Sequence, residues 1–243
     1  MCLLKGKVAI VTGASRGIGR AIAERLAKDK AALVVNYTKS LDEAKKVAVG
    51  IEESGGKAVA VQADVGLVAD VRRLFQETRN AFGRVDILVN NAGIFLMKPI
   101  TDVTEEEYEH IFAINAKGPF FAMQEAAKWM EDGGRIVNIS TGGTQLGFPG
   151  ISAYGGTKGA LEVFTRVMAK ELGPRRITVN TVSPGYTDTD MMADPIRTMG
   201  IEASPLKRIG MPKDIADIVA FLVSEGGGWL TGVNVQAGGG VVM

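Results

Sequence analysis

Seven short apolar runs, separated by longer amphipathic stretches, constrain the fold more than any other feature of this 243-residue sequence. The runs expected to form strands are Lys7–Thr12, Ala32–Tyr37, Ala58–Gln62, Ile87–Asn90, Arg135–Ser140, Thr178–Val182 and Val233–Gln236. The stretches expected to form helices lie near Ile18–Lys28, Asp42–Ser54, Val68–Phe82, Thr104–Met130, Ala153–Leu172 and Pro212–Ser224. This alternation is typical of a parallel sheet with crossover helices. We therefore predict an α/β fold: a doubly wound, seven-stranded parallel sheet with helices on both faces, formed by residues 1–243 as a single domain. Lys117-Gly118-Pro119 should kink the fourth helix, because proline removes a backbone donor.

Composition excludes several classes of protein. Hydrophobic residues make up 46% of the chain and charged residues 23%, which suits a large buried core. The net charge of +1 argues against nucleic acid or an anionic membrane as the main partner. Cys2 is the only cysteine and His110 the only histidine, so we expect no internal disulfide and no metal site. The sequence carries neither a signal segment nor the ~18–20 apolar residues of a membrane span, and a cytoplasmic location is expected.

A glycine-rich turn directly after the first strand predicts a dinucleotide site. In Thr12-Gly13-Ala14-Ser15-Arg16-Gly17-Ile18-Gly19, the spacing G-x-x-x-G-x-G opens into an amphipathic helix. Glycines here allow a tight turn, a close approach of backbone to a pyrophosphate and close packing of helix on strand. The helix start offers free N–H groups and its dipole to the anion. The predicted contacts in this turn are Gly13, Ser15, Arg16, Gly17, Ile18 and Gly19.

The end of the second strand indicates which dinucleotide binds. An NAD-binding site places Asp or Glu there to hold the ribose 2′-hydroxyl. This strand instead ends in Tyr37-Thr38-Lys39-Ser40, and Lys39 together with Arg16 could hold a 2′-phosphate. We therefore predict NADP(H) as the cofactor; the alternative is that both cations are merely solvated. Asp64 and Val65, after the third strand, should flank the adenine, unless Asp64 is an ordinary helix cap.

Tyr154 and Lys158 lie at positions i and i+4 of one predicted helix, which brings a phenol and an ammonium together. A neighbouring positive charge favours phenolate, so we expect Lys158, together with the positive nicotinamide ring of an oxidised cofactor, to lower the pKa of Tyr154 toward the working pH. Other polar residues should gather with them. Ser140-Thr141 and the segment Asn90–Gly93 end strands whose carboxyl ends share one edge of the sheet, and Asn115 lies in the long helix before Ser140.

With these motifs the chain resembles a short-chain dehydrogenase/reductase along essentially its whole length. The residues that carry the resemblance are Thr12–Gly19, Asn90–Gly93, Asn115, Ser140-Thr141, Tyr154–Lys158 and Pro184–Thr189. The resemblance implies that Tyr154 is the general acid in reduction, that Lys158 binds the nicotinamide ribose, and that Asn115 holds a water of the proton relay. It also implies cofactor contacts from Asn91, Ala92, Gly93, Pro184, Gly185, Thr187 and Thr189, and a homotetramer.

The serine that orients the carbonyl in this family lies 13 residues before the tyrosine, and that register falls on Thr141. Ser140 is one position short and should point to the opposite face of an extended strand. We therefore expect the Thr141 hydroxyl to hold the substrate, with Ser140 as the alternative.

An irregular stretch of about 25 residues that follows Pro184-Gly185 and extends to Met211 breaks the alternation. It contains Met191, Met192, Met199 and Met211, which offer adaptable apolar surface. Segments of this length inside a compact domain are often lids, so residues 185–211 are expected to cover the substrate. A surface excursion packed on the core is the alternative.

Two sequence features bear on the substrate class, and they point in different directions. Pro205–Gly210 resembles the 3-oxoacyl-(acyl carrier protein) reductase branch, and Arg175-Arg176 could attract an acidic carrier, whereas Glu131-Asp132 would repel it. We favour a carbonyl reductase of small ketones, keto esters or diketones, with the carrier-protein reductase as the alternative. A non-catalytic nucleotide sensor on the same fold is a minor alternative. A serine hydrolase is excluded because no G-x-S-x-G elbow occurs.

Overall fold

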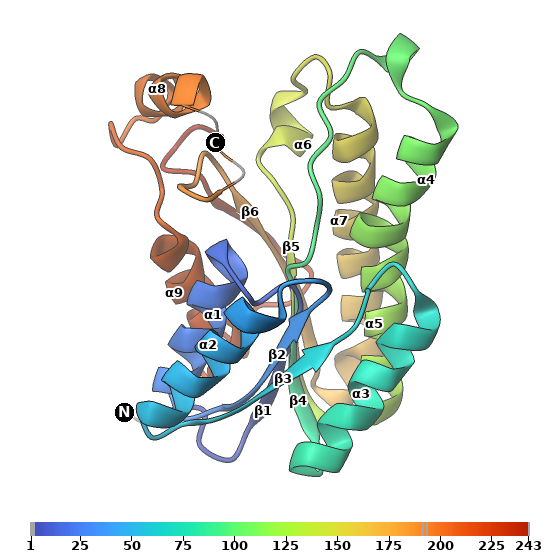
Figure 1. The fold of residues 1–243 in the computed structure, drawn as a ribbon, viewed down its shortest axis with the longest axis vertical. Helices are drawn as coiled ribbons and strands as arrows, with labels where there is room; N and C mark the ends of the chain where they lie inside the picture. The colour runs from blue at the N-terminus through green and yellow to red at the C-terminus, as the bar shows by residue number, and fades with distance from the viewer. Residues whose placement is uncertain (1–2, 191, 193, 243) are drawn as a thin grey trace.

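The computed structural model describes residues 3–190, 192 and 194–242, so Cys2 and Met191 lie outside the described residues. Seven strands form one parallel sheet in the order β3-β2-β1-β4-β5-β6-β7 (Figure 1). Their bounds are β1 Val8–Val11, β2 Ala32–Tyr37, β3 Lys57–Gln62, β4 Val85–Asn90, β5 Met130–Ile139, β6 Thr178–Pro184 and β7 Asn234–Ala237. The predicted fold class is confirmed, and every predicted strand is present in the described structure.

The strand order reverses beside β1, which pairs with β2 on one side and with β4 on the other. Val11 at the end of β1 is in register with Val35 and with Val89. In open α/β sheets, ligands bind beyond the carboxyl ends of the strands at such a switch point. The fold therefore places the glycine turn after β1 and the polar residues after β4 at the same crevice.

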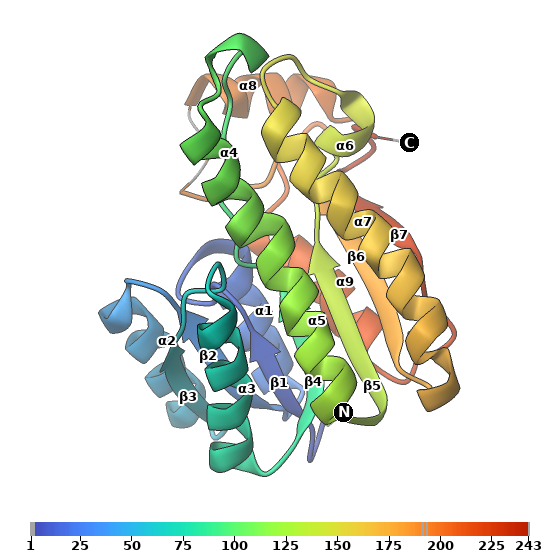
Figure 2. The ribbon, with the colours of Figure 1, turned by 90° about the vertical axis from the view of Figure 1, so that its right-hand side faces the viewer.

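Helices cover both faces of the sheet (Figures 1 and 2). The helices α1 Gly17–Lys28, α2 Leu41–Glu53 and α9 Pro212–Val223 cover one face, and α3 Val68–Phe82, α5 Gly118–Trp129 and α7 Ser152–Leu172 cover the other. In β1, Ala9 and Val11 belong to one buried hydrophobic cluster and Ile10 to a second one. Alternate residues thus enter different cores, which explains why the strands are apolar at successive positions.

The long fourth helix is interrupted one turn before the predicted kink. It consists of α4 Glu105–Phe112, a π-helical turn Ala113–Lys117, and α5. Gly118 N donates to Ala113 O, five residues back, and Pro119 has no N–H with which to reach the carbonyl of Asn115. The widened π-helical turn therefore accommodates Pro119, and the helix continues without a break. Such turns are frequent at functional sites, and this one contains Asn115.

The irregular stretch expected between residues 185 and 211 contains a helix, α8 Asp194–Ala203, which corrects the prediction. Asp194-Pro195 in the sequence is typical of a helix start. The remaining short elements are α6 Gly143–Leu146 and two 3₁₀ turns, Ile100–Asp102 and Gly173–Arg175. Both α6 and α8 lie at the carboxyl end of the sheet (Figure 1). Among the described residues, no helix has the length and apolar character required to cross a membrane.

Candidate active site

The glycine turn after β1 has the geometry that close packing requires. Gly13 has φ +62°, and a Cβ there would lie 2.9 Å from Ala92 Cα. A Cβ on Gly19 would contact the Gly13 carbonyl and would lie 2.5 Å from Asn91 Nδ2. Gly17 has φ +55° and faces Thr189. Ser15 is buried, whereas Arg16 is largely exposed at the outer side of the turn. A side chain at Gly13 or Gly19 would distort this turn.

Three polar side chains hold the turn in place. Asn36, buried near the end of β2, accepts from Gly13 N at 3.2 Å and donates to Ala63 O at 3.0 Å. Asn91 Nδ2 donates to Thr12 O at 2.8 Å, and Thr12 Oγ1 accepts from Asn91 N at 2.9 Å. Asn36 was not predicted. Its signal was a single amide in an otherwise apolar strand, where a buried amide needs partners.

The residues predicted to select the cofactor lie around the end of β2. Tyr37 is buried, while Thr38 and Lys39 are exposed and Ser40 is half-buried. Arg16 Nη1 lies 3.9 Å from Asp190 Oδ2, and both side chains are mostly exposed. The structure thus leaves two cations, Lys39 and Arg16, accessible at this end of the crevice. With this exposure, the ion pair of Arg16 contributes little stability.

Asp64 is not a helix cap. Its Oδ1 accepts from Gly66 N at 2.9 Å, and α3 begins at Val68 after Leu67. Its own N–H is held by Asp70 Oδ2 at 2.8 Å. Val65 is buried, and a Cβ on Gly118 would lie 2.5 Å from its carbonyl, so the start of α5 packs tightly against this segment. Asp64 therefore stabilises a turn beside the crevice.

Tyr154 lies in the first turn of α7, and its phenol forms a hydrogen bond with the Thr141 side chain. The neighbouring Ser140 points elsewhere: its hydroxyl donates to Glu162 Oε1 at 2.7 Å. The two hydroxyls diverge because successive side chains of an extended strand point to opposite faces. The structure brings together Tyr154 and Thr141, and it directs the Ser140 hydroxyl to Glu162.

Lys158 lies one turn after Tyr154 and is buried. Its Nζ donates to Ile139 O at 2.8 Å and lies 5.9 Å from the centre of the Tyr154 ring. Burial lowers the pKa of Lys158 from 10.5 to about 8. A Cβ on Gly93 would lie 3.4 Å from Lys158 Nζ and 3.2 Å from Asn115 Oδ1, so the three predicted residues adjoin one another.

Asn115 is fully buried in the π-helical turn. Its Oδ1 accepts from Ile94 N at 2.9 Å, and its Nδ2 donates to Ile94 O at 2.9 Å. The same Nδ2 lies 3.3 Å from Thr157 Oγ1. The side chain therefore ties α4–α5 to the segment after β4 and to α7, beside Lys158.

The expected lowering of the Tyr154 pKa by Lys158 is wrong for this structure. Burial raises the pKa of Tyr154, and the hydrogen bond with Thr141, which lowers it, is the smaller effect. The reason is desolvation: the phenolate loses more hydration than one hydroxyl replaces. The same burial acts on Lys158, so phenol and ammonium are both pushed toward their neutral forms.

The segment after β6 closes over the glycine turn. Gly142 N donates to Pro184 O at 2.9 Å, and a Cβ on Gly17 would lie 3.6 Å from Thr189 Cγ2. The two ends of the predicted lid are joined, because Gly210 N donates to Tyr186 O at 2.9 Å and Asp188 N donates to Gly210 O at 2.8 Å. Thr187, which is buried, pairs with Gly210 as an isolated bridge.

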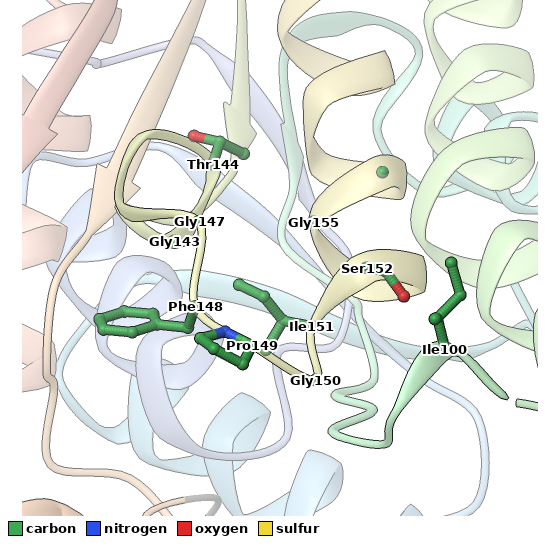
Figure 3. Close-up of a pocket in the computed structure, with 11 residues that line it drawn as sticks. Ile100, Gly143, Thr144, Gly147, Phe148, Pro149, Gly150, Ile151, Ser152 and Gly155 are labelled. Atoms are coloured by element: carbon green, nitrogen blue, oxygen red, sulfur yellow. The ribbon is translucent and has the colours of Figure 1, made fainter. Parts of the chain in front are cut away.

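Phe95 packs against the phenol ring, and further apolar side chains lie on the neighbouring loops. The Phe95 ring packs edge-on against the Tyr154 ring at 5.0 Å and remains 47% exposed. Met97 is exposed beside Gly150, where Lys98 N donates to Gly150 O at 2.7 Å. A cavity of about 420 Å³ lies under the α6–α7 loop (Figure 3). Its lining includes Phe148 and Ile151, and it adjoins the Thr141 turn through Gly143 rather than containing Tyr154.

Two predicted surface features lie at the other end of the molecule. Arg175 Nε donates to Asp132 Oδ1 at 2.8 Å, and both residues are near the amino ends of β5 and β6. Neither Arg175-Arg176 nor Glu131-Asp132 therefore borders the catalytic crevice, and the charge argument built on them for or against a carrier protein fails. Trp229 is 98% exposed, and His110 is exposed on α4.

Comparisons with known proteins agree with this architecture. A family model described as enoyl-(acyl carrier protein) reductase matches residues 13–242. The chain is 49% identical over 247 residues to an uncharacterized oxidoreductase of Methylorubrum extorquens, covering 99% of this chain and 100% of that protein. It is 40% identical to the tetrahydroxynaphthalene reductase of Pyricularia oryzae, covering 99% of this chain and 91% of that one.

A solved structure extends the agreement to three dimensions. The angucycline C-6 ketoreductase LanV, crystallised with bound NADP, superposes with a TM-score of 0.94 at 44% identity, covering 98% of this chain and 96% of that one. Together with the glycine turn and the Tyr154–Lys158 pair, these matches establish that the chain belongs to the short-chain dehydrogenase/reductase family.

Proposed function

We propose that this protein is an NADPH-dependent reductase that converts ketones to secondary alcohols, with Tyr154 as the general acid. The observation that carries the proposal is the convergence of a phenol, a hydroxyl and a buried ammonium at the switch point of the sheet. A relative named as a tetrahydroxynaphthalene reductase, a solved neighbour named as a ketoreductase, and solved neighbours that hold NADP or NADPH support the same reaction.

The residues of the crevice fit NADP(H). The pyrophosphate would lie over Gly13–Gly19 at the start of α1, where Cβ atoms would fill the space, with Ser15, Ile18 and Thr189 around it. Lys39 and Arg16 would hold the 2′-phosphate; Tyr37, Thr38 and Ser40 lie beside them. The adenine would lie near Asp64 and Val65. The remaining proposed contacts are Asn91, Ala92, Gly93, Pro184, Gly185 and Thr187.

The chemistry divides between the cofactor and the chain. When bound, NADPH supplies the hydride to the carbonyl carbon. Thr141 donates a hydrogen bond to the carbonyl oxygen and orients it, and the Tyr154 phenol transfers its proton to that oxygen. Lys158 binds the nicotinamide ribose and stabilises the developing phenolate, while Asn115 holds a water through which the proton is replaced. The carbonyl gains one hydride and one proton, which makes a secondary alcohol.

For the substrate we propose free ketones, keto esters or diketones. The exposed Phe95 ring, packed against the Tyr154 ring, supports an uncharged substrate that brings apolar surface of its own. The alternative is a 3-oxoacyl thioester on acyl carrier protein, which the Pro205–Gly210 resemblance and the acyl-carrier description of the matching family model favour. A nucleotide sensor, the minor alternative, would have no need of the proton-transfer residues.

The lid and the oligomer are proposals as well. Residues 185–211 would close over the substrate as a unit, since their ends are joined at Tyr186 and Gly210 and Met199 is exposed toward solvent. A homotetramer would cover exposed apolar side chains on three helices and one loop, namely Phe120, Val163, Val167, Phe221 and Trp229. Light scattering coupled to gel filtration tests the assembly; a monomer would contradict it.

NADPH oxidation measured against a substrate panel tests the function. The panel contains aliphatic ketones, keto esters, bicyclic aromatic ketones, 3-oxoacyl thioesters on a carrier protein and an enoyl thioester. We expect NADPH-dependent turnover of free ketones and its loss in Tyr154→Phe. A kcat/KM for the carrier thioester far above that for every free ketone would establish the alternative, and oxidation only with the enoyl thioester would refute ketone reduction.

A further inference from the structure

Glu162 on α7 is bonded to the turn that carries Thr141. One of its oxygens, Oε1, accepts from the Ser140 hydroxyl at 2.7 Å and from the Thr144 hydroxyl at 2.9 Å. Glu162 is half-buried, and no salt bridge to it is found within the part of the chain that the structure describes. Its two contacts are therefore with residues on either side of Thr141, one before it and one three positions after it.

The turn between these two anchors determines where the Thr141 hydroxyl lies. Thr141 Oγ1 accepts from Gly143 N at 3.2 Å, and the Thr144 hydroxyl lies 3.0 Å from Thr141 O as well as close to Glu162. Figure 3 shows Thr144 on the side of this turn remote from Phe148 and Pro149. The backbone is bonded to β6 by Ser140 N and Gly142 N, which donate to Val182 O and Pro184 O. Within the described structure, residues 143–146 form no hydrogen bond to β6, and the bond between Thr144 and Glu162 ties this part of the turn to α7.

We propose that Glu162 is a positioning residue that holds the Thr141 hydroxyl against the Tyr154 phenol. A carboxylate oxygen can accept two hydrogen bonds at once, and the amide oxygen of a glutamine in the same place can do so as well. Glu162 touches neither substrate nor phenol and acts through Thr141, so its effect on turnover rests on the proposed function. Its effect on the Tyr154–Thr141 hydrogen bond does not.

A double-mutant cycle in ketone reduction tests the kinetic consequence. Because displacement of a catalytic group by about 1 Å can cost on the order of 100-fold, we expect Glu162→Ala to lower kcat by roughly 10- to 100-fold with an unchanged KM for NADPH. Glu162→Gln retains an acceptor oxygen and should recover most of the rate. In a Thr141→Ala background, Glu162→Ala should cost little more. Glu171→Ala, an exposed acid on the same helix, is the matched control.

A second measurement does not depend on turnover. The titration of Tyr154, isolated by subtracting the tyrosinate absorbance of Tyr154→Phe, reports its hydrogen bond with Thr141, which lowers its pKa. Glu162→Ala and Thr141→Ala should both raise the Tyr154 pKa, and Glu162→Gln should not. An unchanged titration in folded Glu162→Ala, or an equal rate loss with and without Thr141, overturns the proposal. Absence of any ketone turnover in the native enzyme would refute the proposed function alone.

Discussion

Replacement of buried Lys158 by methionine should make the protein more stable while abolishing its activity. Lys158 is 5% exposed, and burial lowers its pKa from 10.5 to about 8, a difference of about 2.5 units. At about 1.36 kcal/mol per unit, burial of this ammonium lowers the free energy of unfolding by about 3 kcal/mol at pH 7. Loss of the hydrogen bond to Ile139 O costs about 1 kcal/mol, so a net gain of about 2 kcal/mol is expected.

The dependence on pH makes this prediction specific. The folded pKa lies below the unfolded one, so between about pH 8 and pH 10.5 the unfolded chain binds more protons and the native protein becomes more stable as pH rises. The advantage of Lys158→Met should therefore shrink by about 2 kcal/mol between pH 7 and pH 9.5.

Urea unfolding at fixed protein concentration measures the stability difference between Lys158→Met and the native protein at pH 7 and at pH 9.5. Lys45→Met, the same substitution at an exposed lysine of α2, should show no such change between the two pH values. If Lys158→Met is less stable than the native protein at pH 7, or if its advantage is the same at pH 7 and pH 9.5, the reasoning from desolvation is refuted.

Three further predictions follow from the structure. Lys39→Ala and Arg16→Ala should each lower kcat/KM for NADPH by about 10- to 100-fold, from ~1.5–3 kcal/mol per charged hydrogen bond, and leave NADH unaffected; an equal loss with both cofactors contradicts the 2′-phosphate assignment. Gly19→Ala places a Cβ against the Gly13 carbonyl and should weaken NADPH binding by about 1–3 kcal/mol, measured by fluorescence titration, whereas Gly50→Ala, with open space around it, should not. Asp86→Ala should lower the free energy of unfolding by about 3 kcal/mol, because it leaves Val8 N without its acceptor and removes the partner of Arg84 and Lys7. Burial raises the pKa of Asp86, but the hydrogen bonds from Arg84 and Val8 outweigh burial, so the pKa is lowered in the folded protein. The stability that the Asp86 carboxylate contributes should therefore be present above about pH 4 and lost as pH falls. Urea midpoints of Asp86→Ala and the native protein that differ equally at pH 3 and pH 6 would contradict this.

The sheet could be predicted from the sequence because both of its faces are buried. Val8–Val11 and Ile87–Val89 are apolar at successive positions, and turns flank the strands that contain them, so the strand type followed from period and length. The glycine turn could be placed for the same reason, since it directly follows a strand. Helix α8 was not predicted because its ten residues include Pro195 and Gly200, the two residue types that disfavour a helix most.

Parts of the site depend on contacts that no local pattern carries. Asn36 and Glu162 each bond residues more than twenty positions away, so only the fold brings them to the glycine turn and to Ser140. The direction of the Tyr154 pKa was wrong because the spacing of Tyr154 and Lys158 indicates proximity but not burial. Arg175 and Asp132 were weighed against each other as features of the crevice, and the strand direction places them at the opposite edge.

The phenol of Tyr154 as proton donor is the central claim, and Tyr154→Phe tests it most directly. The variant removes one hydroxyl and leaves Lys158, Thr141 and the glycine turn in place. Single-turnover reduction of the best free ketone of the panel should slow by about 100- to 10,000-fold, while the Kd for NADPH stays within about twofold and Tyr108→Phe, a control on the exposed face of α4, behaves like the native enzyme. A Tyr154→Phe variant that reduces the ketone within threefold of the native rate would contradict the account.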